Sequence, residues 1–297
     1  MRKILKWIGI ALGSLIGLLA IALIVLNFVG SAKANKIYEI AGETVTIPTD
    51  AAAIQRGQHV AIIYTCTNCH TANLGGELGF VVPGMVSIPT PNLTSGAGGI
   101  APLLSDEDWL RAIRHGVGHD GRGLLIMPAQ GFNDLSAEDL GALIAYLKSV
   151  PPVENQLPER RVELLGRVMM GVGLFPAPAV DKIDHTSPPG ELPMAGVSIE
   201  SGRYLTRTCL ECHGASLNGA PFGPPGQEVP SPNLTPGGEL AGWTKEQFFT
   251  TIRTGFTPGG HQLSEDMPWV NFGQMTDEEL SSVWLYLQSL PALEQGG

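Results

Sequence analysis

CTNCH at residues 66–70 places two thiols and an imidazole within five residues, and the same arrangement returns as CLECH at residues 209–213. Such a set of side chains has three possible chemical roles: it can bind a zinc ion, form a redox-active disulfide or bind haem covalently. The two motifs together use all four cysteines of the 297-residue chain. Fold and function therefore depend on which of these three roles the rest of the sequence supports.

The recurrence of this motif belongs to a longer internal repeat. Several other segments return about 140 residues later in the same order. They are PNLT at 91–94 and 232–235, Met-Pro at 127–128 and 267–268, and LSAEDLGALIAYLKSVP at 135–151 with MTDEELSSVWLYLQSLP at 275–291. Such a repeat indicates two copies of one small domain, which we place at residues 50–153 and 197–297. We expect a linker at 31–49 before the first copy and a Pro-rich linker at 154–196 between the two.

The secondary structure predicted for each copy is helical. SAED at 136–139 and TDEE at 276–279 are helix-start patterns ahead of the closing helices. A second pair of helices opens at Ser105 and Thr244, and a third pair leads into the cysteine motifs. No alternation of apolar and polar residues indicates a strand, so the sequence predicts an all-α fold. Within the Pro-rich linker, residues 159–175 predict a short helix packed between the domains.

The N-terminus is the most apolar part of the chain. The 23 residues from Trp7 to Val29 carry no charge, which matches the roughly 20 residues that cross a bilayer better than the roughly 7–15 of a signal-peptide core. We expect residues 1–30 to form one retained transmembrane helix, with a cleavable signal ending at Ala32-Lys33-Ala34 as the alternative. Basic residues before the span predict a cytoplasmic N-terminus, and hence both cysteine motifs on the periplasmic side of the inner membrane.

The order of the residues in the motif favours haem binding among the three possible roles. In C-x-x-C-H, two cysteines one helical turn apart bond to the vinyl groups at one edge of the porphyrin, while the adjacent histidine coordinates the iron. Zinc sites use wider cysteine-to-histidine spacings, and a thioredoxin-like C-x-x-C belongs to a βαβ setting that this sequence lacks. We predict two covalently attached haem c groups. Their binding residues are Cys66, Cys69 and His70 in the first copy and Cys209, Cys212 and His213 in the second.

The ligand on the other side of each iron decides between electron transfer and chemistry at an open iron. Met127 and Met267 occupy matching places in the two copies, each followed by a proline and shortly before the closing helix. The proline fixes its own φ and helps to hold the loop in one conformation. Met85 is the rival of Met127, but the second copy has no methionine at the equivalent place. We therefore predict Met127 and Met267 as the second axial ligands.

Other histidines and arginines have less specific interpretations. Five histidines lie outside the motifs and do not recur between the copies, which favours surface or hydrogen-bonding roles. Of these, His115 and His261 are kept as alternative iron ligands. Arg114 and Arg253 do recur. Each is either the partner of a haem propionate, a carboxylate that a guanidinium suits, or a solvated charge on a helix face.

The chain resembles the class I c-type cytochromes. The segments that carry the resemblance are CTNCH, PNLT, IRHG at 113–116, the closing helix and their second-half partners. The chain is similar in particular to the tandem-haem cytochrome subunits of membrane-bound bacterial dehydrogenases, over residues 50–153 and 197–292. The resemblance implies low-spin haem with histidine and methionine ligands in each domain, moving one electron at a time. It also implies a membrane-bound dehydrogenase as redox partner.

Two classes of function follow from these features. The favoured one is a membrane-anchored diheme cytochrome that moves single electrons from a dehydrogenase or quinol-oxidising donor to a terminal acceptor, such as an oxidase, and is not itself an enzyme. The alternative is a diheme enzyme such as a peroxidase, in which one haem loses its methionine. A net charge of −10 argues against nucleic acid as a partner. Residues 197–297 carry eleven acidic and four basic side chains, which favours a basic docking protein.

Overall fold

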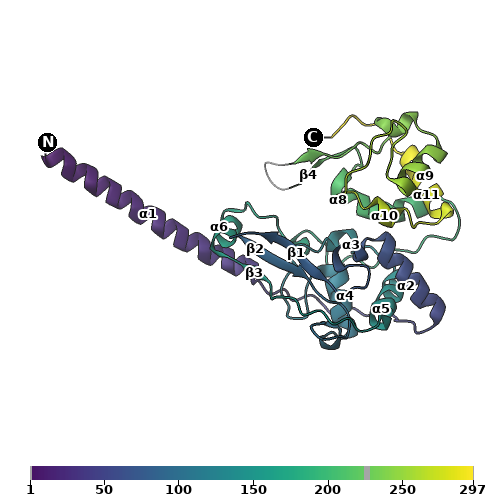
Figure 1. Ribbon diagram of the computed structural model, residues 1–297, viewed down its shortest axis with the longest axis horizontal. Helices are drawn as coiled ribbons and strands as arrows, with labels where there is room; N and C mark the ends of the chain where they lie inside the picture. The colour runs from purple at the N-terminus through teal and green to yellow at the C-terminus, as the bar shows by residue number, and fades with distance from the viewer. Residues whose placement is uncertain (1, 224–227, 297) are drawn as a thin grey trace.

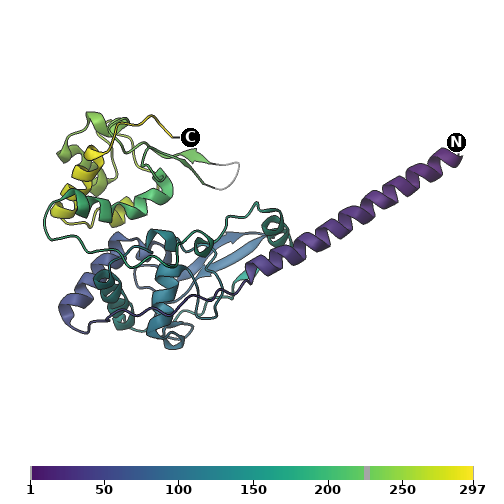
Figure 2. The same cartoon turned by 180° about the vertical axis from the view of Figure 1, so that it is seen from behind.

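Each half of the chain is organised by the packing of its first helix against its last (Figure 1). The computed structural model describes residues 2–223 and 228–296. The helix pairs are α2 (Ala51–Ile63) with α5 (Ala137–Ser149), and α7 (Ile199–Leu205) with α11 (Asp277–Ser289). The two halves lie side by side, and α1 (Arg2–Ala34) extends away from the first half as one long helix (Figure 2).

Close packing of these helix pairs depends on one glycine in each half. A Cβ at Gly57 of α2 would lie 1.9 Å from the carbonyl oxygen of Ala142 in α5. A Cβ at Gly202 of α7 would lie 2.0 Å from the carbonyl oxygen of Ser282 in α11. Only a residue without a side chain lets the two backbones approach so closely. The same kind of contact therefore fixes how the first and last helices meet in both halves.

The helix starts predicted from the sequence are confirmed. The side chains of Ser136 and Thr276 accept hydrogen bonds from backbone N–H groups in the first turns of α5 and α11. Ser105 and Thr244 do the same for the middle helix of each half, where a reciprocal bond completes a capping box. Each cap satisfies a donor that the first helical turn leaves unpaired.

Shorter elements carry the cysteine motifs and the loops between the main helices. The cysteine motifs lie in α3 and at the junction of η4 with α8, where η denotes a 3-10 helix. In chain order these elements are α3 (Cys66–His70), η1 (Ala101–Leu103), α4 (Asp106–His115), η2 (Ala129–Gly131), η3 (Ala179–Asp181), η4 (Arg207–Cys209), α8 (Leu210–His213), η5 (Glu239–Gly242), α9 (Lys245–Thr254) and α10 (Trp269–Phe272).

The prediction of an all-α fold is wrong in the long loop of each half. In the first half β1 (Glu77–Val82) and β2 (Val86–Thr90) form an antiparallel hairpin, and β2 also pairs with β3 (Arg161–Val162) from the linker. In the second half β4 (Pro221–Phe222) pairs with β5 (Val229–Pro230). The side chains of β1 are nearly all exposed, so this strand lacks the alternation of apolar and polar residues that indicates one. Helices still form most of the regular structure (Figure 1).

The helix predicted within the linker exists as α6 (Leu164–Val172), but the prediction that it packs between the domains is wrong. It packs against the C-terminal end of α1, next to the first-half sheet (Figure 1). A Cβ at Gly30 would lie 1.7 Å from the carbonyl oxygen of Arg167, so the two helix backbones touch. The Arg167 side chain also donates to Asn27 Oδ1 at 2.7 Å. The linker thus connects the first half to the apolar helix.

The two halves contact each other through reciprocal pairs of elements. His59 of α2 lies 2.9 Å from the Glu279 carboxylate at the start of α11. In the opposite direction, Tyr204 of α7 donates a hydrogen bond of 2.7 Å to Asp139 at the start of α5. The first helix of each half therefore meets the start of the last helix of the other half. Buried apolar side chains from both halves form one continuous core around these contacts.

Candidate functional site

The histidine of each cysteine motif is held by a backbone carbonyl group. His70 Nδ1 lies 3.0 Å from the carbonyl oxygen of Pro91, and His213 Nδ1 lies 2.8 Å from that of Pro232. Because a carbonyl oxygen only accepts hydrogen bonds, Nδ1 carries the proton in both rings. Nε2 then keeps its lone pair, which is the arrangement in which an imidazole ligates a metal ion while its other nitrogen fixes the ring orientation.

The repeated PNLT segments explain why those carbonyl groups are in place. Asn92 Oδ1 accepts hydrogen bonds from the backbone N–H of Thr94 at 3.0 Å and from its hydroxyl at 2.8 Å. The Asn92 amide donates to the carbonyl oxygen of Val153 at 2.7 Å. Asn233 makes the equivalent bonds within the second PNLT segment and to the carbonyl oxygen of Leu293. Each asparagine thus ties its loop to the segment after the last helix and fixes the proline carbonyl that holds the histidine.

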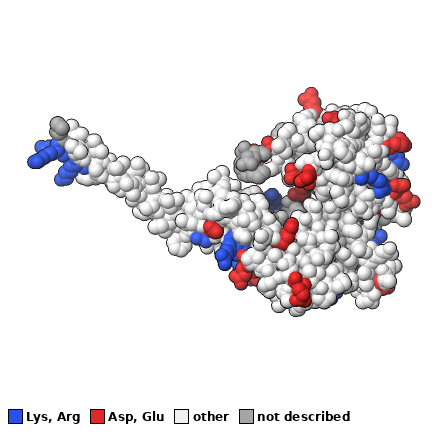
Figure 3. Space-filling view, viewed as in Figure 1, with Lys and Arg blue, Asp and Glu red and all other residues white. Residues whose placement is uncertain are grey.

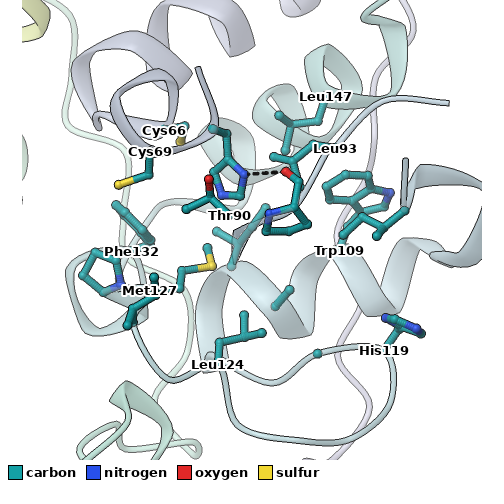
Figure 4. Close-up of a pocket in the computed structure, with 18 of the residues that line it drawn as sticks. Cys66, Cys69, Thr90, Leu93, Trp109, His119, Leu124, Met127, Phe132 and Leu147 are labelled. Carbon is teal, nitrogen blue, oxygen red and sulfur yellow. Dashed lines mark hydrogen bonds between the residues drawn. The ribbon is translucent and has the colours of Figure 1, made fainter. Parts of the chain in front are cut away.

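A cavity of about 350 Å³ lies between these elements in the first half. The four residues predicted to hold a cofactor there, Cys66, Cys69, His70 and Met127, all line it. Figure 4 shows Met127 extending into the space beside the imidazole, whose hydrogen bond to the proline carbonyl is the dashed line. The rest of the wall is mainly apolar and includes Leu93, Trp109, Leu124, Phe132 and Leu147 (Figure 4).

Met127 and Met267 are held by the same backbone turn. In each half the residue two positions later donates its N–H to the methionine carbonyl, at 2.9 Å in the first half and 2.7 Å in the second. The intervening Pro128 has φ and ψ of −81° and 59°, and Pro268 has −78° and 52°, close to the values of an inverse γ-turn. Met85 instead lies in the turn between β1 and β2, outside the cavity wall.

The second half repeats the arrangement on its own elements. Cys209 ends η4, Cys212 and His213 lie in α8, and Met267 precedes α10. Cys209 and Met267 pack against the hydrophobic core, as do their first-half counterparts. The eight residues singled out from the sequence therefore fall into two equivalent sets of four.

Burial controls the protonation of both sets. It raises the pKa of Cys66 and of Cys209 to about 12, so both thiols are neutral at physiological pH. Burial also lowers the pKa of His70 and of His213, and outweighs the opposing effect of the hydrogen bond to the proline carbonyl. Both imidazoles are therefore neutral, as metal ligation requires.

These donor groups fit haem c. Each set offers two thiols for thioether bonds, an imidazole with a free Nε2, and a thioether on a loop of fixed conformation. In the first half these groups surround an apolar cavity, which suits a porphyrin. Within residues 2–223 and 228–296, no group of three or more His, Cys, Asp or Glu side chains is arranged to hold a metal ion.

Arg114 and Arg253 brace the loop before the last helix of each half. Arg114 is fully buried, and its Nε donates to the carbonyl oxygen of Asn133 at 2.8 Å. Arg253 donates to the carbonyl oxygen of Met275 at 3.0 Å and pairs with Asp277. Arg114 does not line the cavity, so neither role expected for it, propionate partner or solvated charge, is correct.

Two arginines that sequence reasoning did not single out do line the cavity. Arg122 pairs with Asp120 at 2.6 Å. Arg160 reaches the cavity from the linker and donates to the carbonyl oxygen of Ala34 at 2.9 Å. These guanidinium groups are placed to meet carboxylates on a cofactor, the role expected from the sequence for Arg114. Arg160 lies outside the repeat, so a comparison of the two copies could not reveal it.

Of the two histidines named as alternative ligands, His115 lies apart from the first predicted set. His115 is buried, with ring nitrogens 3.0 Å from His185 and 3.3 Å from Glu43, and it does not line the cavity. His261 is exposed. The loop after α4 and the loop after α9 each contain one isolated β-bridge, between residues 117 and 123 and between residues 256 and 262. When these bridges are aligned, His261 takes the position of Arg122.

Comparison with known proteins matches the repeat to one family. The family described as cytochrome c oxidase, cbb3-type, subunit III matches residues 52–147 and 199–287. The chain is 27% identical over 296 residues to the fructose dehydrogenase cytochrome subunit of Gluconobacter japonicus, covering 85% of this chain and 56% of the relative. It is 29% identical over 284 residues to the cytochrome c subunit of alcohol dehydrogenase (quinone) of Gluconacetobacter polyoxogenes, covering 83% and 58%.

A third relative comes from a different dehydrogenase. The chain is 32% identical over 111 residues to the gluconate 2-dehydrogenase cytochrome c subunit of Pantoea cypripedii, covering 34% of this chain and 24% of the relative. The chain spans little more than half the length of the fructose and alcohol dehydrogenase subunits that it matches. The family match includes both cysteine motifs, because it covers residues 66–70 and 209–213.

Proposed function

The chain belongs to the family of cytochrome c oxidase, cbb3-type, subunit III, and from this we propose that it is a diheme cytochrome that transfers single electrons. Covalently bound haem c follows from the family, and the number of two rests on the two complete ligand sets. The proposed axial pairs are His70 with Met127 and His213 with Met267. A carrier role agrees with the relatives, which are named as cytochrome subunits of dehydrogenases.

Haem c, when bound, supplies a reversible one-electron couple at its iron. The residues of the chain set the conditions for that couple. The carbonyl groups of Pro91 and Pro232 orient the imidazoles through their Nδ1–H groups. The methionine thioethers would fill the remaining axial positions, and a thioether ligand there would raise the reduction potential and close the iron to other ligands. The apolar wall of the first cavity excludes water from the site.

The duplicated ligand frame is the observation that carries this proposal. The bond from histidine to a proline carbonyl and the inverse γ-turn at the methionine occur in both halves with nearly the same geometry. A peroxidase would need one iron with an open position. Because the methionine is held in the same way at both centres, electron transfer is favoured over peroxidase chemistry at each.

Contacts between the halves support electron exchange between the two centres. Thr67, inside the first cysteine motif, accepts a hydrogen bond of 2.9 Å from Asn271 of α10. Glu211, inside the second motif, accepts one of 2.6 Å from Gln130 of η2. Each motif thus touches the segment that follows the axial methionine of the other half. We expect the haem edges bonded to the cysteines to face this shared interface and to exchange electrons directly.

The proposed anchor is α1, as a single pass through the inner membrane with both centres on the periplasmic side. Among the residues that the structure describes, α1 alone is long and apolar enough to cross a bilayer. Figure 3 shows the shaft of α1 free of charged side chains between its basic start and its junction with the first half. The contacts of Gly30 and Lys33 with α6 favour a retained helix over a cleaved signal, because cleavage would expose the side of α6 that they cover.

The proposed electron donor is a membrane-bound dehydrogenase, as in the complexes that the relatives' names describe. The proposed acceptor is a terminal oxidase. The acidic residues of the second half, eleven against four basic ones between 197 and 297, favour docking of a basic protein there. Such docking should weaken with added salt, and electron-transfer rates that do not change with ionic strength would remove this part of the proposal.

Spectroscopy of the full chain purified in detergent tests the proposed function. We expect two haem groups per chain, retained on a denaturing gel because they are covalently bound. In the ferric protein we expect the weak sulfur-to-iron absorption band at the red end of the visible spectrum and slow binding of cyanide. One haem per chain would contradict the count. Rapid binding of cyanide by one centre would favour the peroxidase alternative.

A further inference from the structure

We propose that α6 lies on the surface of the bilayer and contacts lipid with its outward face, so that the first half is held against the membrane in one orientation. This inference rests on the proposal that α1 spans the membrane. It assigns a role to a helix that takes no part in either ligand set, and it is supported by the position, the packing and the composition of that helix.

The position of α6 along α1 corresponds to the edge of a bilayer. A hydrocarbon core about 30 Å thick is crossed by about 20 helical residues. Counted from Trp7, where the uncharged run begins, these residues end near Leu26. The contacts between the two helices include Leu26, Asn27, Gly30 and Lys33 of α1. α6 therefore lies where α1 leaves the hydrocarbon core and enters the headgroup layer.

One side of α6 is occupied by α1 and by the first-half hairpin. A Cβ at Gly171 would lie 2.5 Å from the carbonyl oxygen of Leu26, and one at Gly166 would lie 2.3 Å from that of Met85. Met170 is buried on the same side. The outward side chains are apolar and open to the surroundings. Their exposed fractions are 60% for Leu164, 52% for Leu165, 50% for Val172 and 58% for Leu174 just beyond the helix.

The composition of the outward face suits lipid. Of the nine residues of α6, Arg167 alone is charged, and its guanidinium turns inward to Asn27 and to the carbonyl oxygen of Val162. A contiguous apolar face in water favours association, whereas in the headgroup layer it is buried at the acyl boundary. Arg161 and Glu163 are both exposed just before the helix, and Arg161 supplies a cation of the kind that anionic lipid phosphates attract.

Continuity with α1 decides between lipid and a protein as the occupant of this face. No residue in the most apolar window of α1 is buried by the rest of the protein, so lipid must cover this window when the helix spans a bilayer. α6 packs against the outer end of that same helix, and its apolar side chains extend the lipid-covered surface sideways (Figure 1). A protein partner would have to enter the headgroup layer to cover α6 instead.

Spin labels on the full haem-loaded protein, in vesicles of phosphatidylethanolamine and phosphatidylglycerol, test this placement. Haem attachment uses the four native cysteines, so a single introduced cysteine can be labelled. Leu165→Cys reports on α6, and Leu15→Cys reports on α1. Leu285→Cys is the matched control, an exposed leucine of α11 at the end of the molecule remote from α1 (Figure 1). Collision rates with lipid-soluble oxygen and with a water-soluble nickel complex are compared at each position.

We expect the ratio of oxygen to nickel collisions to be several-fold higher at 165 than at 285, and highest at 15. If the label at 165 is as accessible to nickel as the one at 285 while the label at 15 lies in lipid, the placement of α6 on the bilayer surface is refuted. The proposal that α1 spans the membrane is then retained. Access of nickel to the label at 15 would refute the anchor itself and, with it, this inference. Protection at 165 that appears only after a purified dehydrogenase is added would assign the face to a protein.

Discussion

The two halves of the molecule share a ligand frame and differ in what surrounds it. Both hold the histidine by a proline carbonyl and the methionine by an inverse γ-turn. In the first half a long hairpin is extended by β3 from the linker, and Arg122 and Arg160 line the cavity. In the second half the strands are two residues each, and His261 stands at the position of Arg122. If both frames hold haem as proposed, they would form two centres of one type, and their different surroundings would let the two potentials differ.

The strongest test of the likeness between the halves is at the helix crossings. Gly57→Ala and Gly202→Ala should each lower the free energy of unfolding by about 2–3 kcal/mol, because the added methyl group overlaps a backbone carbonyl. Denaturant titration followed by circular dichroism measures this loss. Gly242→Ala is the control, since a Cβ there meets no atom within 4 Å. A large loss at only one of the two crossings would show that the halves are not stabilised alike.

Removing the two methionines proposed as axial ligands tests whether the proposed centres are of one type. Met127→Ala and Met267→Ala should each abolish the sulfur-to-iron band of one haem. Each should also lower that haem's potential by on the order of 0.1 V, within the roughly 0.8 V range that axial ligands cover. Spectroelectrochemical titration of each variant resolves the two couples. Met85→Ala is the control for the first half, and a loss of the band in that variant instead of Met127→Ala would reverse the assignment.

The charge at the first cavity provides a test of the difference between the halves. Arg122→Gln should lower the potential of the first centre by about 20–70 mV, the effect of one charge about 10 Å away at an effective dielectric constant of 20 to 80. The pairing of Arg122 with Asp120 favours the lower end of this range. Arg122→Lys should keep most of the potential because it keeps the charge. An equal shift at both centres would mean that the arginine does not distinguish them.

The smallest expected effect concerns the contact between the halves. Burial acts to raise the pKa of Glu279, but hydrogen bonds from His59 and from the backbone N–H of Thr276 outweigh it and leave this pKa below its ordinary value near 4.5. The stability that Glu279 adds is therefore complete above pH 4.5 and is lost as the pH falls through the lowered pKa. At neutral pH we expect it to be below about 1 kcal/mol, because the pair is partly exposed.

Glu279→Gln isolates this effect, because glutamine at the same place preserves the capping box of α11. The difference in unfolding free energy between the wild-type protein and this variant should shrink as the pH is lowered from 7 towards 3. Denaturant titrations at a series of pH values measure it. A difference that stays constant over this range would show that the carboxylate charge does not stabilise the contact.

The ligand frame could be predicted from the sequence because its parts are local and repeated. Two cysteines, a histidine and a Met-Pro pair recur in order, and the caps at Ser136 and Thr276 need only neighbouring residues. The structure places these ligand residues in equivalent sets, and their roles as haem ligands remain the proposal made above. The repeat also directed attention to Arg114, although its hydrogen bonds turned out to brace a loop.

Features that depend on distant parts of the chain could not be predicted. β1 has no buried face, so its pairing with β2 leaves no periodic signal in the sequence. Arg160 reaches the first cavity from the linker, which has no second copy for comparison. The packing of α6 on α1 is a contact between elements about 140 residues apart. Burial and contacts between distant segments are determined by the tertiary structure, and a local sequence pattern does not reveal them.

The reciprocal contacts between the halves have a consequence for how such a molecule can diverge. A single-domain chain with this surface would pair with a second copy of itself about a two-fold axis, and each substitution would then appear on both sides. Joining the copies in one chain removes that constraint. Asp139 bonds to Tyr204 where Glu279 bonds to His59, so equivalent contacts of the two halves already differ in their side chains. Either face can therefore change alone, so the two halves can acquire different surfaces.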